Sequence, residues 1–296
     1  MIARSAPEIL TQADVLWMEG RIPQARQACL RARMKFHKER DPTGEAQAVL
    51  LLGEMELAGG NVDAARTHFV EARTLLVRGG DSRHQGAVLL GLGKIAATAR
   101  QYDESRTHYG AALAHYRGAG DVEGEAEALV GLAEADRALG RDDLGLDALA
   151  RARRLYHDVG DGLGEAGALR ALAMLHASNH RADQAHDALE EAVSLYEQVG
   201  DVLDQAGVQA ELGTLLNGLG DVAGACEALR RAAVLYAEAG DLEGEADALM
   251  DLGAAEQATD PTNARRHFAH AAALFGTAGH VMLREAAEDA ARAVRH

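Results

Sequence analysis

The feature that most constrains the fold is a repeat of 40 residues that runs through the chain. An Asp opens each repeat after a Gly or an Arg, at Arg40-Asp41, Gly80-Asp81, Gly120-Asp121, Gly160-Asp161, Gly200-Asp201 and Gly240-Asp241. Gly279-His280 closes the last repeat one residue early. A fixed period of this kind is typical of a solenoid, in which each repeat packs against its neighbours. The period therefore overrides the two domains that a length of 296 residues would suggest.

Each repeat has the pattern of two helices. Counted from the opening Asp, apolar residues recur three and four positions apart on both sides of position 20. This spacing predicts amphipathic helices, and the alternation of period two that is typical of strands is absent. Gly at the end of the second half can end a helix in the left-handed conformation, and the Asp that follows can cap the next helix. We expect two helices of roughly 17 residues joined by a tight turn.

The sequence predicts seven helical hairpins and one further helix, which is fifteen helices in all. The expected repeats are residues 1–40, 41–80, 81–120, 121–160, 161–200, 201–240 and 241–279 of one continuous superhelix. The first helix begins with Ser5-Ala6-Pro7-Glu8, a capping box that contains a proline. Residues 280–296 are expected to form a helix that covers the open end of the stack. Its predicted packed stripe consists of Leu283, Ala287, Ala290 and Val294.

The residues at equivalent positions resemble the tetratricopeptide repeat (TPR) family. The family spacing is seen in Leu52-Gly53, Ala65, Phe69 and Ala72, and again in Leu212-Gly213, Ala225, Leu229 and Ala232. The resemblance covers essentially the whole chain, although the period of 40 exceeds the family's usual period of about 34. Repeats of this length resemble those of bacterial signalling and regulatory proteins and of kinesin-light-chain adaptors. The resemblance implies an all-α, right-handed α-solenoid that binds peptides or partner proteins on its concave face.

By that resemblance, the first helix of each repeat lines a groove, with positions 10, 14 and 17 directed into it. The N-terminal part of this groove is rich in leucine, whereas the central part holds three cations in an acidic chain. This pattern predicts a site for a segment that has an apolar end and an acidic end. The candidate partner-binding residues are Leu50, Glu54, Leu57, Leu90, Lys94, Arg137, Arg170 and Asn217.

Alternatives remain open at these positions. The leucines can instead pack against neighbouring helices, and the cations can balance Glu54, Glu134 and Glu211. Trp17 is the only Trp of the chain. It is a candidate anchor for a partner or for a second copy of the chain, since Trp is frequent at interface hot spots. The alternative is that Trp17 packs within the first repeat.

Composition excludes several kinds of partner. The formal net charge is −16, whereas a nucleic-acid-binding surface needs clustered cations. No apolar stretch approaches the length of a membrane-spanning helix, and the N-terminus does not resemble a signal peptide. Cys29 and Cys226 lie in the first and sixth repeats, so we expect no disulfide between them. Free thiols suit the reducing cytoplasm.

No residue pattern indicates catalysis, a metal site or a cofactor. His176 and His180 are four apart and His267 and His270 three apart, but no further Cys or carboxylate completes a zinc site. Carboxylates recur at the same repeat positions, which indicates helix caps and solvated faces rather than an acid–base pair. The sequence therefore predicts a non-enzymatic cytoplasmic scaffold for protein–protein interaction. Two alternatives are a peptide-sensing regulator that acts through a separate effector and a scaffold that self-assembles through its terminal helices.

Overall fold

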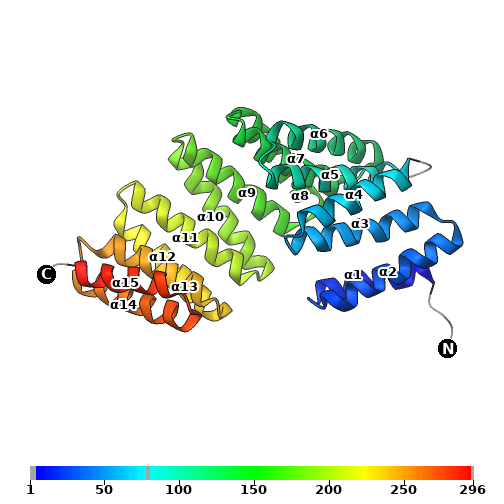
Figure 1. Cartoon of the computed structure of the whole chain (residues 1–296). Helices are drawn as coiled ribbons and strands as arrows, with labels where there is room; N and C mark the ends of the chain where they lie inside the picture. Colours follow the sequence, from blue (N-terminus) through cyan, green and yellow to red (C-terminus); the bar gives the residue numbers. More distant parts are fainter. Residues whose placement is uncertain (1–4, 78–80, 295–296) are drawn as a thin grey trace. The chain divides into compact units, whose positions relative to one another are not determined.

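The computed structural model describes residues 5–77 and 81–294, and this part of the chain forms fifteen α-helices (Figure 1). The chain divides into two compact units, Met1–Val159 and Gly160–His296. The first unit contains α1 (Ala6–Met18), α2 (Ile22–Glu39), α3 (Pro42–Ala58), α4 (Val62–Leu76), α5 (Ser82–Thr98), α6 (Tyr102–Ala119), α7 (Val122–Ala138) and α8 (Asp142–Val159). The second unit contains α9 (Gly162–Ser178), α10 (Ala182–Val199), α11 (Val202–Gly218), α12 (Val222–Ala239), α13 (Leu242–Glu256), α14 (Pro261–Ala278) and α15 (Val281–Ala293).

Consecutive helices pack side by side within each unit, so the first unit consists of four hairpins and the second of three hairpins and α15. This confirms the predicted all-α, TPR-like solenoid of seven hairpins and a final helix. The first helices of successive repeats also contact one another, α1 with α3, α3 with α5, α5 with α7, and α11 with α13. They therefore form a shared wall from α1 to α7 in the first unit, and α11 lies against α13 in the second. The single superhelix through residues 1–296 stays a prediction.

Side-chain caps fix where the first helix of each repeat begins. The Ser5 backbone N–H donates to Glu8 Oε2 at 2.7 Å, and the Glu8 N–H donates to Ser5 Oγ at 3.4 Å. This is the predicted capping box. The six opening Asp side chains accept a hydrogen bond from the backbone N–H three residues later, as Asp41 does from Gly44 at 2.9 Å. Each cap satisfies a donor that the first helical turn leaves unpaired.

Complementary sizes set the distance between the two helices of a hairpin. Position 13 is Gly or Ala because a large residue at position 29 lies directly against it. A Cβ atom on Gly93 would lie 2.7 Å from the Tyr109 ring, and one on Gly213 would lie 2.5 Å from Leu229 Cγ. Both distances are shorter than a real van der Waals contact, so these helices approach closely only because the side chain is missing.

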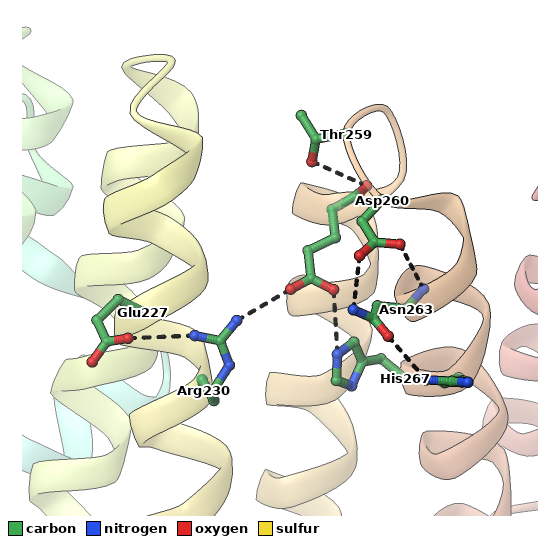
Figure 2. A network of polar contacts seen from close by, with 8 residues as sticks. Glu227, Arg230, Thr259, Asp260, Asn263 and His267 are labelled. Atoms are coloured by element: carbon green, nitrogen blue, oxygen red, sulfur yellow. Dashed lines mark hydrogen bonds and ion pairs between the residues drawn. The ribbon is translucent and has the colours of Figure 1, made fainter.

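Buried carboxylates at position 16 link successive repeats. Glu56, Asp136 and Glu256 are buried, and each forms an ion pair with an Arg on the second helix of the preceding repeat. Figure 2 shows the last of these links, in which Arg230 reaches from α12 to the Glu256 carboxylate at 3.2 Å and His267 lies on the other side at 3.3 Å. The prediction that recurring carboxylates lie on solvated faces or act as caps is therefore wrong at position 16. These acids stay buried because an Arg compensates for their lost hydration.

The last helix caps its unit with fewer residues than expected. α15 packs on α14, with Ala287 and Val294 buried, and Arg265 Nη2 donates to the Val294 carbonyl at 2.8 Å. Leu283 is 41% exposed, so it does not belong to the packed stripe. The predicted stripe is wrong at this position because Arg284 faces α14 in this turn, where a Cβ atom on Gly276 would lie 3.3 Å from Arg284 Cδ.

Candidate partner-binding cavities

The first unit contains a cavity of about 450 Å³ in the wall formed by the first helices. Five of the predicted site residues line this first-unit cavity: Trp17, Glu54, Leu57, Leu90 and Lys94. They come from α1, α3 and α5, at positions 10, 14 and 17 of their repeats. The other lining residues are Ala58, Phe69, Ala87, Gly91, Tyr116 and Glu127.

A glycine, Gly91, shapes the floor of the first-unit cavity. Phe69 on α4 reaches between α3 and α5, where a Cβ atom on Gly91 would lie 2.4 Å from its ring. Phe69 and Tyr116 are otherwise buried, so only part of each ring faces the cavity. The result is an apolar floor with charged residues at its sides.

Of the charged residues at the sides of the first-unit cavity, Lys94 and Glu127 pair with each other, whereas Glu54 does not. Lys94 Nζ donates to Glu127 Oε1 at 2.6 Å. Glu54 accepts no hydrogen bond from any residue that the structure describes. Burial raises the pKa of the Glu54 carboxyl to about 7, and Glu127 and Asp14 add to the rise while Lys94 opposes it. The Glu54 residue is nevertheless exposed to solvent. The surrounding protein atoms therefore displace part of the water around its carboxylate and leave the rest in place.

The leucine and tryptophan positions divide between packing and cavity lining. Leu50 is buried in the core that surrounds Phe69 and does not line the cavity, so the packing alternative describes it. Leu90 is also buried, but one side of it faces the cavity, and Leu57 is half-buried there. Trp17 packs against the core of the first hairpin and lines the cavity as well.

A second and larger cavity of about 800 Å³ lies in the second unit. Arg170 stands in its wall and donates from Nε and Nη2 to Glu211 Oε1, at 2.9 and 2.6 Å. Nη1 of Arg170 also lies 3.6 Å from Asp204. This second-unit cavity is mainly apolar. It is lined by Arg170, Ala173, Met174, Ala177, His180, Ala182, Leu189, Gly207, Ala210, Glu211, Thr214, Leu215, Gly218, Leu219, Tyr236 and Asp251.

Acidic groups of the second-unit cavity are poorly hydrated. Burial raises the pKa of Asp251, and Glu211 Oε2 is buried without a hydrogen-bond partner among the described residues. The hydrogen bond to Glu211 is the main reason why the pKa of Arg170 is raised. The Arg170 guanidinium is therefore paired with Glu211 and Asp204, and Asp251 is a further acidic residue of the cavity.

Besides Leu50, two predicted residues lie outside both cavities. Arg137 is exposed on α7, where its charge partly opposes the burial that raises the pKa of Glu134. Asn217 is exposed near the end of α11. Two of the three predicted cations are thus paired with carboxylates, as the charge-balance alternative proposed: Lys94 with Glu127 rather than Glu54, and Arg170 with Glu211.

Sequence analysis missed three residues that line the cavities, Glu127, Tyr116 and Asp251. Glu127 has position 7 of its repeat, three residues before position 10 and on the same helical face. That spacing was the available signal for it. Tyr116 belongs to a second helix and Asp251 to position 11, so the periodicity assigns both to packed or solvated faces.

The histidine pairs do not form a metal site in the described part of the chain, which contains no group of three or more His, Cys, Asp or Glu able to hold an ion. His267 lies 3.3 Å from Glu256, and His270 lies 4.0 Å from Glu245. The His176 Nδ1 atom is buried without a partner among these residues, and burial lowers the pKa of this imidazole. Within the same residues, no helix has the length and apolar character needed to cross a membrane.

Comparisons with known proteins agree with this architecture. The tetratricopeptide repeat family model matches residues 124–198. The fold is similar to that of BtubC from P. vanneervenii, with a TM-score of 0.63 and 17% identity over 80% of this chain and 93% of that one. It is also similar to a Rap protein complexed with Competence and Sporulation Factor, with a TM-score of 0.61 and 13% identity over 98% of this chain and 97% of that one.

A third solved structure contains a similar helical array within a longer protein. It is a STAND signal transduction ATPase with a TPR sensor from Pyrococcus horikoshii, with a TM-score of 0.70 and 13% identity. The match covers 97% of this chain and 47% of that protein. A search of curated proteins found no match. The chain therefore has the fold of a TPR solenoid, and residues 124–198 carry the sequence features of the family.

Proposed function

We propose that this chain is a non-catalytic scaffold that binds a segment of a partner protein along the first helices of its repeats. The observation that carries the proposal is that both cavities are lined mainly by first helices, α1, α3 and α5 in one unit and α9 and α11 in the other. Their volumes of about 450 and 800 Å³ lie within the range of about 300–1,000 Å³ that is typical of ligand sites. The TPR match supports the proposal, because such repeats commonly present binding surfaces of this kind.

In this proposal the predicted residues have different parts. Leu57, Leu90 and Arg170 contact the bound segment, whereas Leu50 supports the wall from behind. Arg137 and Asn217 are exposed and would meet only a segment that extends beyond the cavities. The scaffold acts in the cytoplasm, where its two free thiols, Cys29 and Cys226, stay reduced.

The proposal is tested by site-specific photo-crosslinking in cells of the source organism. A photoreactive phenylalanine analogue replaces Met174, which lines the second-unit cavity, or Val234, which lies on the second helix α12. The two side chains are matched in exposure, at 53% and 54%. We expect Met174 to give a crosslink to a distinct polypeptide and Val234 to give none. Equal crosslinking from both positions, or none from Met174, would contradict binding at the first helices.

A second candidate is a peptide-sensing regulator that acts through a separate effector protein. The similarity to a Rap protein that is complexed with Competence and Sporulation Factor favours it, since that match covers nearly all of both chains. This candidate requires that a short peptide changes the arrangement of the repeats. Small-angle scattering of the chain with and without synthetic peptides encoded near its gene would show a change in the radius of gyration. An unchanged radius at saturating peptide favours the scaffold.

Self-assembly is a third candidate, since the terminal helices expose large apolar side chains. Met18 at the end of α1 is 81% exposed, and Met282 in α15 is 77% exposed. Sedimentation over a range of concentrations tests it. A sedimentation coefficient that rises with concentration, and that Met282→Glu holds at the monomer value, would support assembly through α15.

A further inference from the structure

We propose that the first-unit cavity binds a basic side chain, the guanidinium of Arg or the ammonium of Lys, carried by an apolar segment of a partner protein. This inference rests on the proposed function and adds the chemistry of the residue that the cavity selects. It reverses the charge expected from the sequence, where the cations of the groove predicted an acidic partner.

The apolar part of the cavity suits the stem of a long side chain. Leu57, Leu90 and Phe69 contribute aliphatic and aromatic surface, and Trp17 and Tyr116 add two further rings. Arg and Lys bury their methylene stems against such surfaces while their charged ends reach polar groups. An aromatic ring, Trp above all, also attracts a cation to its face.

The polar part of the cavity contains an unmatched carboxylate. Lys94 is the only cation that lines the cavity among the described residues, and its ammonium group is paired with Glu127. Glu54 accepts no hydrogen bond from the described residues, and burial raises its pKa. A carboxylate in this condition gains most from a cationic donor, because a charge-assisted hydrogen bond replaces the hydration that it has lost.

The charges around Glu54 select against an acidic ligand. The groups that influence it are Asp14 on α1, Lys94 on α5 and Glu127 on α7, so the acids outnumber the single cation. Cys29 on α2 and Tyr116 on α6 are also coupled to Glu54, and burial holds both in the neutral form at neutral pH. An incoming carboxylate would meet repulsion from these acids, whereas an incoming cation would complete the pairing of Glu54.

The chain carries its own reporter for this site. Trp17 is the only Trp and lines the cavity, so its fluorescence reports on occupancy there rather than on binding elsewhere on the acidic surface. The probes are three acetylated, amidated pentapeptides, Leu-Ala-X-Ala-Leu, in which X is Arg, Glu or norleucine. We expect a saturable change in Trp17 emission with the Arg peptide, and at least tenfold weaker binding of the Glu and norleucine peptides.

Three variants locate the effect. Glu54→Gln is expected to weaken the Arg peptide at least tenfold, while Glu123→Gln removes an equal charge from an exposed site on α7 outside the cavity and leaves the affinity unchanged. Lys94→Met frees Glu127 and is expected to strengthen the Arg peptide. This opposite direction matters, since a variant that merely misfolds cannot bind more tightly.

The proposal is overturned if no Arg-dependent change in Trp17 emission occurs, if the Glu peptide binds as well as the Arg peptide, or if Glu54→Gln and Glu123→Gln behave alike. Its failure is distinct from failure of the proposed function. A crosslink from Met174 with no Arg selectivity keeps the scaffold and removes the basic ligand. Arg-selective binding in the first-unit cavity with no crosslink from Met174 keeps the basic ligand and removes binding at the first helices of the second unit.

Discussion

Arg106 on α6 and Asp136 on α7 form an ion pair across the boundary of two repeats, with 2.7 Å between Nε and Oδ1. Asp136 is buried, and Arg141 in the turn between α7 and α8 lies 3.7 Å from the same oxygen. Glu56 and Glu256 occupy the equivalent position and are paired in the same way. The pairing couples each of these three hairpins to the one before it, because a displaced hairpin would leave a buried charge without its partner.

Arg106→Ala is expected to lower the free energy of unfolding by about 1–2 kcal/mol, since it leaves the buried Asp136 with a weaker partner. The value stays below that of a fully buried pair because the Arg106 side chain is 41% exposed and Arg141 is close. Urea unfolding followed by circular dichroism measures the change. Arg154→Ala is the matched control, an exposed Arg on α8 whose loss is expected to have little effect. Equal effects of the two substitutions would show that the ion pair contributes nothing.

Gly131→Ala is expected to destabilise the protein by about 1–3 kcal/mol, although Ala is the better helix former. A Cβ atom there would lie 2.5 Å from the Tyr109 ring, which is buried and has little room to move. Gly110→Ala is the control, since a Cβ atom on this α6 residue meets nothing within 4 Å. It is expected to stabilise by about 0.5–1 kcal/mol. Thermal melts that rank both variants on the same side of the parent would contradict this packing.

Glu54→Gln is expected to change how stability depends on pH. Burial raises the Glu54 pKa from 4.5 to about 7. The folded chain therefore holds a proton that the unfolded chain has released, and the free energy of unfolding falls as pH rises through this interval. Gln removes this dependence. After allowance for solvent screening, the free energy of unfolding of the variant should exceed that of the parent by about 1 kcal/mol at about pH 8 and equal it at about pH 4.

Urea titrations at several pH values test the Glu54 prediction. The nearby titrating groups, Asp14, Cys29, Lys94, Tyr116 and Glu127, are present in both proteins and largely cancel in the difference. Glu123→Gln is the control for the loss of one negative charge at an exposed site of the same unit. A pH-independent difference between Glu54→Gln and the parent would contradict the raised pKa of Glu54.

Arg100→Gly is expected to raise the free energy of unfolding by about 1 kcal/mol, because Arg100 has a left-handed backbone that costs an L-residue this much. Its φ angle is 58°, where the next repeat places Gly140 at 70°. The reverse change, Gly140→Arg, should lower stability by a similar amount, since a Cβ atom at Gly140 meets nothing within 4 Å and only the backbone is affected. A calorimetric Tm that falls for Arg100→Gly would indicate an unrecognised contact of the Arg side chain.

Most of the fold followed from local patterns in the chain. The spacing of Leu52, Ala65 and Phe69 is set by one hairpin, and the caps at Ser5 and Asp41 involve residues only three apart. Such features are readable without knowing what packs against them. The exposure of Leu283 was not, because it depends on where α15 lies on the preceding hairpin.

The sequence predicted where the residues of the candidate site lie, but not which of their charges are paired. Repeat positions 10, 14 and 17 brought Trp17, Glu54 and Lys94 into one cavity, as helical periodicity on three aligned helices requires. Their chemistry was not readable in this way. Lys94 pairs with Glu127, which lies on a different helix, and that choice leaves Glu54 without a donor among the described residues.

The sequence alone thus determined the helices, their caps and the repeat, because periodicity and capping act between residues of one hairpin. Tertiary structure decided which carboxylates are buried at position 16 and which charge remains unmatched in the first-unit cavity. Those outcomes depend on distances between side chains of successive repeats and on the water that their packing removes. Neither quantity can be inferred from the residue pattern of a single helix.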